Sequence, residues 1–167
     1  MNGFGYYGVI SHVAPKNGRV ISIRPARPDD SADIHLWRND PQTREASVHT
    51  AEVPLSDHEA WLSQVLASSA SLYMAEDHDG EPIGVVRFDP EGAAAEVSIN
   101  LAPAFRGLGL GLPVLSGAID EYERVEGHRP LLATIRTWNT ASVRLFEAVG
   151  FVLASSDGEF LSFRRDA

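Results

Sequence analysis

Three closely spaced glycines, between a predicted strand and a predicted helix, constrain this chain more than any other feature. They are Gly107, Gly109 and Gly111. Residues 95–101 before them alternate between apolar and polar side chains, which is the period of a half-buried strand. Residues 112–122 after them place their apolar side chains on one helical face. The sequence therefore predicts a strand, a glycine turn and a helix in succession.

Such a junction favours an anion, because unpaired backbone N–H groups and the positive end of a helix dipole point at one place. Glycine lets the backbone approach a phosphate closely and adopts positive φ at little cost. A Rossmann loop would need glycine where Leu112 stands, and a P-loop would need Gly-Lys-Ser/Thr, which is absent. A glycine turn without any ligand is the simpler alternative.

The segment that begins at Arg106 resembles Arg/Gln-x-x-Gly-x-Gly/Ala, the pyrophosphate loop of the GNAT N-acetyltransferase superfamily. Residues 139–151 resemble the second signature of that family, Asn-x-x-Ser/Ala-x-x-Leu-Tyr/Phe-Glu-x-x-Gly-Phe. Both signatures stand in the family's order and at the family's spacing. The chain is therefore identified as resembling a GNAT acetyltransferase.

Composition limits the alternatives. The 167 residues suit one domain, and the net charge of -9 argues against nucleic acid or an anionic membrane as partner. The chain has no cysteine, so a disulfide, a thiolate metal site and an acyl-cysteine intermediate are excluded, which favours direct group transfer. Without a recognisable signal peptide or a membrane-length apolar run, we expect a cytoplasmic protein.

The hydrophobic pattern predicts the order β-α-α-β-β-β-α-β-α-β-β over residues 20–165. This is the layout of the GNAT fold, an α/β (α+β) arrangement in which helices flank a mixed, mainly antiparallel sheet. The first helix should end at Asn39-Asp40-Pro41, and a capping box at Ser56 and Glu59 should open the second. We assign residues 20–167 to the acetyltransferase domain. Residues 1–19 show no period and are assigned to an N-terminal extension, for which a homodimer contact is one role considered.

The resemblance implies acetyl-CoA as co-substrate and no metal. In the family, acetyl-CoA lies between two central parallel strands, which correspond here to residues 96–101 and 131–136. Backbone groups would hold the pantetheine, the thioester carbonyl and the pyrophosphate, while Arg144 would reach the 3′-phosphate. Arg106 is either a phosphate ligand or a solvated loop arginine. The implied CoA-binding residues are Asn100, Leu101, Arg106, Gly107, Leu108, Gly109, Leu110, Gly111, Leu112, Asn139, Ser142 and Arg144.

Catalysis needs a group that removes a proton from the attacking amine. Glu96 is the first candidate for this general base, because relatives use a carboxylate on the corresponding strand. A salt-bridged structural role for Glu96 is the alternative, and His49 and His58 are weaker candidates. Phe146 stands where many relatives carry a tyrosine that protonates the leaving thiolate. That proton would then come from Ser142, from water or from no side chain.

The acceptor is expected to be a small-molecule amine. The segment from Trp37 to Arg44 is similar to the branch that acetylates the 4-amino group of nucleotide-linked sugars in pseudaminic-acid biosynthesis. Arg38, Asn39 and Arg44 would then bind the amino-sugar nucleotide, although a cation and an asparagine also suit a helix C-terminus. Two alternatives stay open: N-terminal acetylation of a ribosomal protein, and a non-catalytic acyl-CoA-binding regulatory domain.

Overall fold

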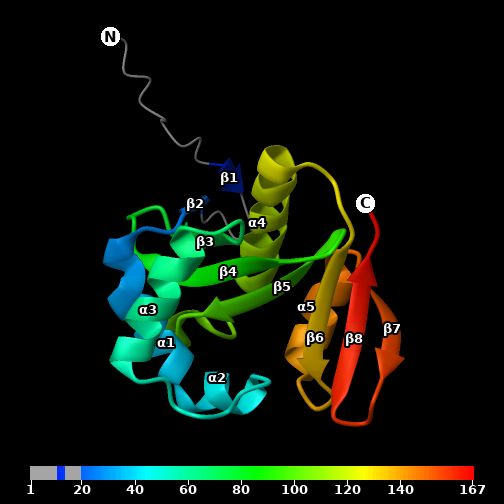
Figure 1. Cartoon of the computed structure of the whole chain (residues 1–167). Coiled ribbons are helices and arrows are strands. Elements are labelled where there is room, and N and C mark those ends of the chain that lie inside the picture. The colour runs from blue at the N-terminus through cyan, green and yellow to red at the C-terminus, as the bar shows by residue number, and fades with distance from the viewer. Residues whose placement is uncertain (1–10, 14–19) are drawn as a thin grey trace.

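The computed structural model of the chain describes residues 11–13 and 20–167, and its strands form a single sheet (Figure 1). The sheet order is β1-β2-β3-β4-β5-β6-β8-β7, and every neighbouring pair is antiparallel except β5 and β6. The strands are β1 Ser11–Val13, β2 Ile21–Pro25, β3 Ser71–Glu76, β4 Pro82–Glu91, β5 Ala94–Leu101, β6 Leu131–Arg136, β7 Val152–Ser156 and β8 Phe160–Arg165.

Helices cover both faces of this sheet (Figure 1). Helix α4 packs across β2, β3 and β4 and contacts α5, while α1 contacts β5 and α3 contacts β3. The α-helices are α1 Ser31–Asn39, α2 Pro41–Ala46, α3 Leu55–Leu66, α4 Gly111–Glu126 and α5 Thr140–Ala148, and the 3-10 turns are η1 Pro28–Asp30 and η2 Pro103–Phe105.

Strand alternation divides the core between the two faces. In β3, Leu72 and Met74 join the apolar cluster under α1 and α3, whereas Tyr73 joins the larger cluster under α4 and α5. In the larger cluster the Phe88 ring stacks on Tyr122 of α4, with ring centroids 4.1 Å apart. The predicted mixed, mainly antiparallel sheet between helices is confirmed.

The predicted end of the first helix at Asn39-Asp40-Pro41 is confirmed, because α1 ends at Asn39. The short helix that follows, α2, was not predicted; the Asp40 carboxylate caps it by accepting a hydrogen bond from Thr43 N–H. The capping box at Ser56 is not formed, because α3 begins at Leu55 with Pro54 at its N-cap. Strand β1, which pairs with β2, falls inside the predicted extension. Residues 1–10 and 14–19 lie outside the described residues, so the extension and its dimer contact stay predictions.

The centre of the sheet opens between β5 and β6. The two strands pair only where Ala95 and Glu96 lie beside Leu131 and Leu132. The later residues of β5 and β6 do not pair with each other. The sheet is therefore split toward the C-terminal ends of these two parallel strands. Within the described part of the chain, no helix is long and apolar enough to cross a membrane.

Candidate active site

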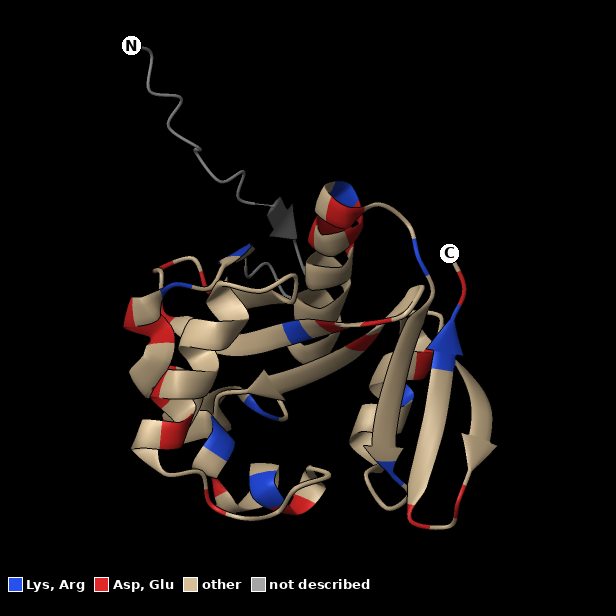
Figure 2. Ribbon diagram, viewed as in Figure 1, with Lys and Arg blue, Asp and Glu red and all other residues tan. Residues whose placement is uncertain are grey.

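The split between β5 and β6 opens into a cleft of about 1040 Å³. Its walls come from β4, β5, β6, the glycine loop, α5 and the segment from α1 to residue 49. Helices α1 and α2 both contribute lining residues, and Figure 2 shows basic positions, in blue, on these two helices. Most residues predicted from sequence for the site line it: Arg38, Glu96, Asn100, Leu101, Arg106, Gly107, Gly109, Gly111, Leu112, Asn139, Ser142 and Arg144.

The glycine loop requires glycine for two different reasons. Gly107 and Gly109 have φ of +71° and +72°, and a Cβ at either would meet no atom within 4 Å. Gly111 has no positive φ, and its Cβ would stand 3.2 Å from a methyl carbon of Leu145 in α5. The first two glycines therefore shape an open turn, whereas the third allows α4 and α5 to pack closely.

The first turn of α4 leaves backbone donors unpaired beside the cleft, which Gly111 and Leu112 line. Leu110 is the N-cap, and the N–H groups of Leu110, Gly111 and Leu112 have no carbonyl four residues earlier within the helix. Pro113, the next residue, carries no N–H at all. The Leu110 side chain is buried and Leu108 is exposed, so neither side chain lines the cleft and only their backbone groups are candidates.

Helix α5 forms the opposite wall. The Asn139 side chain caps it by accepting a hydrogen bond from Ser142 N–H at 3.2 Å. Phe146 is 3% exposed and packs edge-on against Phe151, with ring centroids 5.0 Å apart. Phe146 thus belongs to the core and also lines the cleft, and Ser142 is the hydroxyl-bearing residue of α5 that lines it.

Glu96 is half-buried on the cleft side of β5, directly opposite Asp89 of β4. Its carboxylate has no hydrogen-bonding or ion-pair partner among the described residues, so the salt bridge that was the alternative role for Glu96 is not formed. His58 lies outside the cleft, where its ring contacts the Ser31 carbonyl at 2.9 Å and burial lowers its pKa. His49 does line the cleft.

Residues 47–53, which follow α2, are called the strap here. Side chains from other parts of the protein form hydrogen bonds with the backbone of this strap. The Asn39 side chain accepts a hydrogen bond from Val53 N–H at 2.8 Å and donates one to the Val53 carbonyl at 2.9 Å. Arg44 donates to the Thr50 carbonyl at 3.0 Å. Arg136, the last residue of β6, donates to the Ser47 carbonyl from across the split in the sheet. Asn39 and Arg44, two predicted acceptor ligands, therefore support the strap and do not line the cleft.

Two arginines that line the cleft, Arg38 of α1 and Arg87 of β4, keep unused donors. The Arg38 Nη2 donates to the His49 carbonyl at 2.7 Å, but its Nη1 is buried without a partner. Arg87 Nε is likewise buried and unpaired, and these are the only two such side-chain atoms in the described residues. Burial, with a contribution from Arg44, lowers the pKa of Arg38. Buried unpaired donors favour an anionic partner.

Sequence reasoning missed Asp40, Thr43, Arg87 and Arg136. Asp-Pro is a helix-start signal, so the cap at Asp40 could have been predicted. Arg87 reaches the cleft through the pairing of β4 with β5, where it lies opposite Ser98. No local pattern specifies that register, so Arg87 carried no signal of its own.

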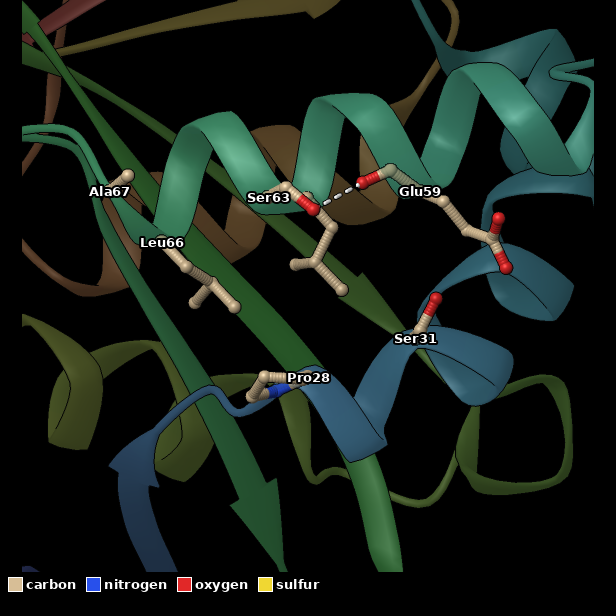
Figure 3. A pocket seen from close by; sticks show the side chains of 7 residues that line it. Pro28, Ser31, Glu59, Ser63, Leu66 and Ala67 are labelled. Atoms are coloured by element: carbon tan, nitrogen blue, oxygen red, sulfur yellow. Dashed lines mark hydrogen bonds between the residues drawn. The ribbon is translucent and has the colours of Figure 1, made fainter.

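A second, smaller hollow lies between α3 and the segment from Pro28 to Ser31 (Figure 3). Glu59 is its one ionisable lining residue, and the Ser63 hydroxyl donates to the Glu59 carbonyl within the same helix. This hollow therefore offers no second catalytic group.

Comparison with known proteins agrees with this geometry. The family model described as an acetyltransferase (GNAT) domain matches residues 21–152. An L-methionine sulfoximine/L-methionine sulfone acetyltransferase of Pseudomonas aeruginosa is 28% identical over 140 residues, which are 80% of this chain and 81% of that protein. The corresponding Salmonella typhimurium protein is 38% identical over 68 residues, 41% of this chain and only 39% of that protein.

Among solved structures, spermidine N-acetyltransferase from Vibrio cholerae in complex with CoA and spermine superposes with a TM-score of 0.75. It is 18% identical, and the match covers 86% of this chain and 94% of that chain, which shows a shared fold. The family model spans most of the chain, from β2 to the start of β7. The chain therefore belongs to the acetyltransferase (GNAT) family and is an acetyl-CoA-dependent N-acetyltransferase.

Proposed function

We propose that this enzyme transfers an acetyl group from acetyl-CoA to the primary amine of a small acceptor that also carries an anionic group, as an amino acid does. One observation carries the proposal: the acceptor side of the cleft combines the unpaired Glu96 carboxylate with the unused donors of Arg38 and Arg87. A zwitterion complements the Glu96 carboxylate and the Arg38 guanidinium, while Arg87, whose Nη2 pairs with Asp89 at 2.6 Å, offers its Nε donor. The relatives named for L-methionine sulfoximine, itself an amino acid, support this class of acceptor.

On the donor side, the pyrophosphate of acetyl-CoA would lie at the N-terminus of α4. Backbone N–H groups of residues 108–112 would hold it, and the open space beside Gly109 supports this placement. Backbone groups at Asn100 and Leu101 would hold the pantetheine and the thioester carbonyl. Asn139, Ser142 and Arg144 of the opposite wall would border the rest of CoA.

The chemistry is a direct transfer. Glu96 accepts a proton from the acceptor ammonium, itself or through water, because the ammonium has no lone pair. The amine nitrogen then attacks the thioester carbonyl carbon. Collapse of the tetrahedral intermediate breaks the C–S bond, and the nitrogen gives its second proton to water as the amide forms. Phe146 cannot protonate the departing thiolate, so Ser142 or water supplies that proton.

A nucleotide-linked 4-amino sugar is the second candidate acceptor, because the donors of Arg38 and Arg87 also suit a diphosphate. For that acceptor Arg38 would meet the phosphates. An N-terminal peptide of a ribosomal protein has no negative charge fixed beside its amine, so these two donors do not favour it. A cytoplasmic location remains a prediction from the sequence.

Thiol release from acetyl-CoA, measured across acceptor classes, tests the proposal. The panel contains L-methionine sulfoximine, a nucleotide-linked 4-amino sugar, spermidine and a ribosomal N-terminal peptide. We expect the highest kcat/KM for the amino acid, and a wild-type rate that rises with pH until the base is ionised. If spermidine or the peptide were the best acceptor, anion recognition in the cleft would be rejected.

A further inference from the structure

Arg106, the first residue of the glycine-loop signature, directs its side chain away from the loop. Its Nε donates to the Leu101 carbonyl at 3.1 Å, its Nη1 to Asp40 Oδ1 at 2.5 Å and its Nη2 to Thr43 Oγ1 at 2.7 Å. The Arg106 side chain is only 21% exposed. All three guanidinium nitrogens are therefore engaged by the protein, and the group is held against α2.

Two of these partners are themselves tied to the cleft walls. Asp40 Oδ1 also accepts from Thr43 N–H at 3.2 Å, which caps α2. The Thr43 hydroxyl donates to Asn100 Oδ1 on β5 at 3.1 Å. The hydrogen bond from Arg106 lowers the pKa of Asp40, so this carboxylate is charged at neutral pH. We use the name clasp for these four side chains: Asp40, Thr43, Asn100 and Arg106.

Helix α2 depends on polar contacts for its position. It spans Pro41–Ala46, and none of its residues is buried, so it has no apolar anchor in either core cluster. Thr43 and Gln42 nevertheless line the cleft on its acceptor side. The clasp connects this wall to the residue immediately before Gly107, across more than sixty positions of sequence.

We infer that Arg106 is a positioning residue that fixes the acceptor wall α2 to the acetyl-CoA loop, instead of binding a phosphate. The inference rests on the proposed acetyl transfer at this cleft. Because one guanidinium holds both the end of β5 and the N-cap of α2, the acceptor wall keeps its place relative to the thioester only while the clasp is closed. Opening the clasp should therefore weaken binding of the acceptor more than binding of acetyl-CoA.

The test compares Arg106→Lys and Asp40→Asn with a control on the same helix. Asparagine caps helices as well as aspartate does, so Asp40→Asn keeps α2 while removing the charged partner. Glu45 on α2 is exposed, and Glu45→Gln makes the same charge change outside the clasp. We expect each clasp variant to raise the acceptor KM about tenfold or more, since hydrogen bonds between charged groups carry effects of that size.

We further expect the acetyl-CoA dissociation constant of both clasp variants, measured by calorimetry, to stay within about twofold of wild type, and the double variant to be no worse than the singles. Hydrogen exchange gives a readout that needs no turnover: amides of residues 42–46 should exchange faster in both clasp variants but not in Glu45→Gln. The exchange result tests the clasp without reference to the acceptor. The proposed acceptor could therefore be wrong while the exchange result still supports the clasp. Weaker acetyl-CoA binding by Arg106→Lys, with unchanged exchange in α2, would make Arg106 a phosphate ligand and overturn the inference.

Discussion

Replacing Gly109 by valine should abolish acetyl-CoA binding without unfolding the protein. Gly109 has φ of +72°, and a side chain there would project into open space of the cleft. That space lies beside the free N–H groups at the start of α4, where the pyrophosphate is proposed to bind. The valine would therefore occupy the position of the ligand, and no protein atom would have to move to admit it.

The expected size follows from mass action. Ligand at 100 times its dissociation constant stabilises the folded state by about 2.7 kcal/mol. For a domain of this size, 1 kcal/mol shifts Tm by about 2–4 °C, so wild type should gain roughly 5–11 °C in a thermal-shift assay. The variant should gain nothing at the same concentration.

The control must reproduce the backbone strain, which costs about 1–2 kcal/mol when an L-residue takes a left-handed conformation. Gly80 has φ of +80°, an added Cβ there meets no atom within 4 Å, and it lies in the turn between β3 and β4, outside the cleft. Gly80→Val should thus lower Tm without ligand by a similar amount yet keep the full acetyl-CoA shift. Equal shifts in Gly109→Val and Gly80→Val would refute the role given to the loop.

Three further results are expected. Glu96→Gln keeps the shape of the side chain but not its basicity, so kcat should fall about 10²–10⁴-fold with little change in acetyl-CoA affinity; an unchanged kcat and pH profile would place the base elsewhere. Arg38→Gln should raise the KM of an amino-acid acceptor, whereas Arg44→Gln, which loses a similar bond to the strap outside the cleft, should not; equal effects would limit Arg38 to strap support. Burial opposes ionisation of Asp30, but hydrogen bonds from Arg24 and the Arg27 N–H leave its pKa lowered, so its contribution to stability is present above about pH 4 and is lost as pH falls through the folded-state pKa. The difference in unfolding free energy between wild type and Asp30→Asn should therefore shrink between pH 7 and pH 3 in denaturant titrations, and a constant difference would exclude this linkage.

Local signals in the sequence were enough to predict most of the fold. Alternation identified β5, and the glycine loop and the apolar stripe that follows it located α4. The Asn139 cap located the start of α5. These predictions succeeded because each depends on residues within about one or two turns of each other.

Apart from the unpredicted cap at Asp40 and the wrong capping box at Ser56, the roles that were missed depend on contacts distant in sequence. Arg106 appeared either as a phosphate ligand or as a solvated residue, because its partners on α2 are about sixty positions away. Arg136 likewise meets the Ser47 carbonyl across 89 positions. Gly111 was grouped with its neighbours, but its packing against Leu145 depends on how α4 meets α5. Tertiary packing determines the roles of these residues, and the local sequence pattern does not indicate which distant residues they will contact.

The most direct test of the proposed function compares L-methionine sulfone with the amine that lacks only its carboxylate, at saturating acetyl-CoA. If the unused donors of Arg38 and Arg87 bind the carboxylate, its loss removes hydrogen bonds to charged groups, which carry about 1.5–3 kcal/mol. We therefore expect kcat/KM for the decarboxylated amine to be lower by about 10- to 150-fold. Equal kcat/KM for the two compounds, or a higher value for the amine, would contradict the proposal that this cleft selects a zwitterion.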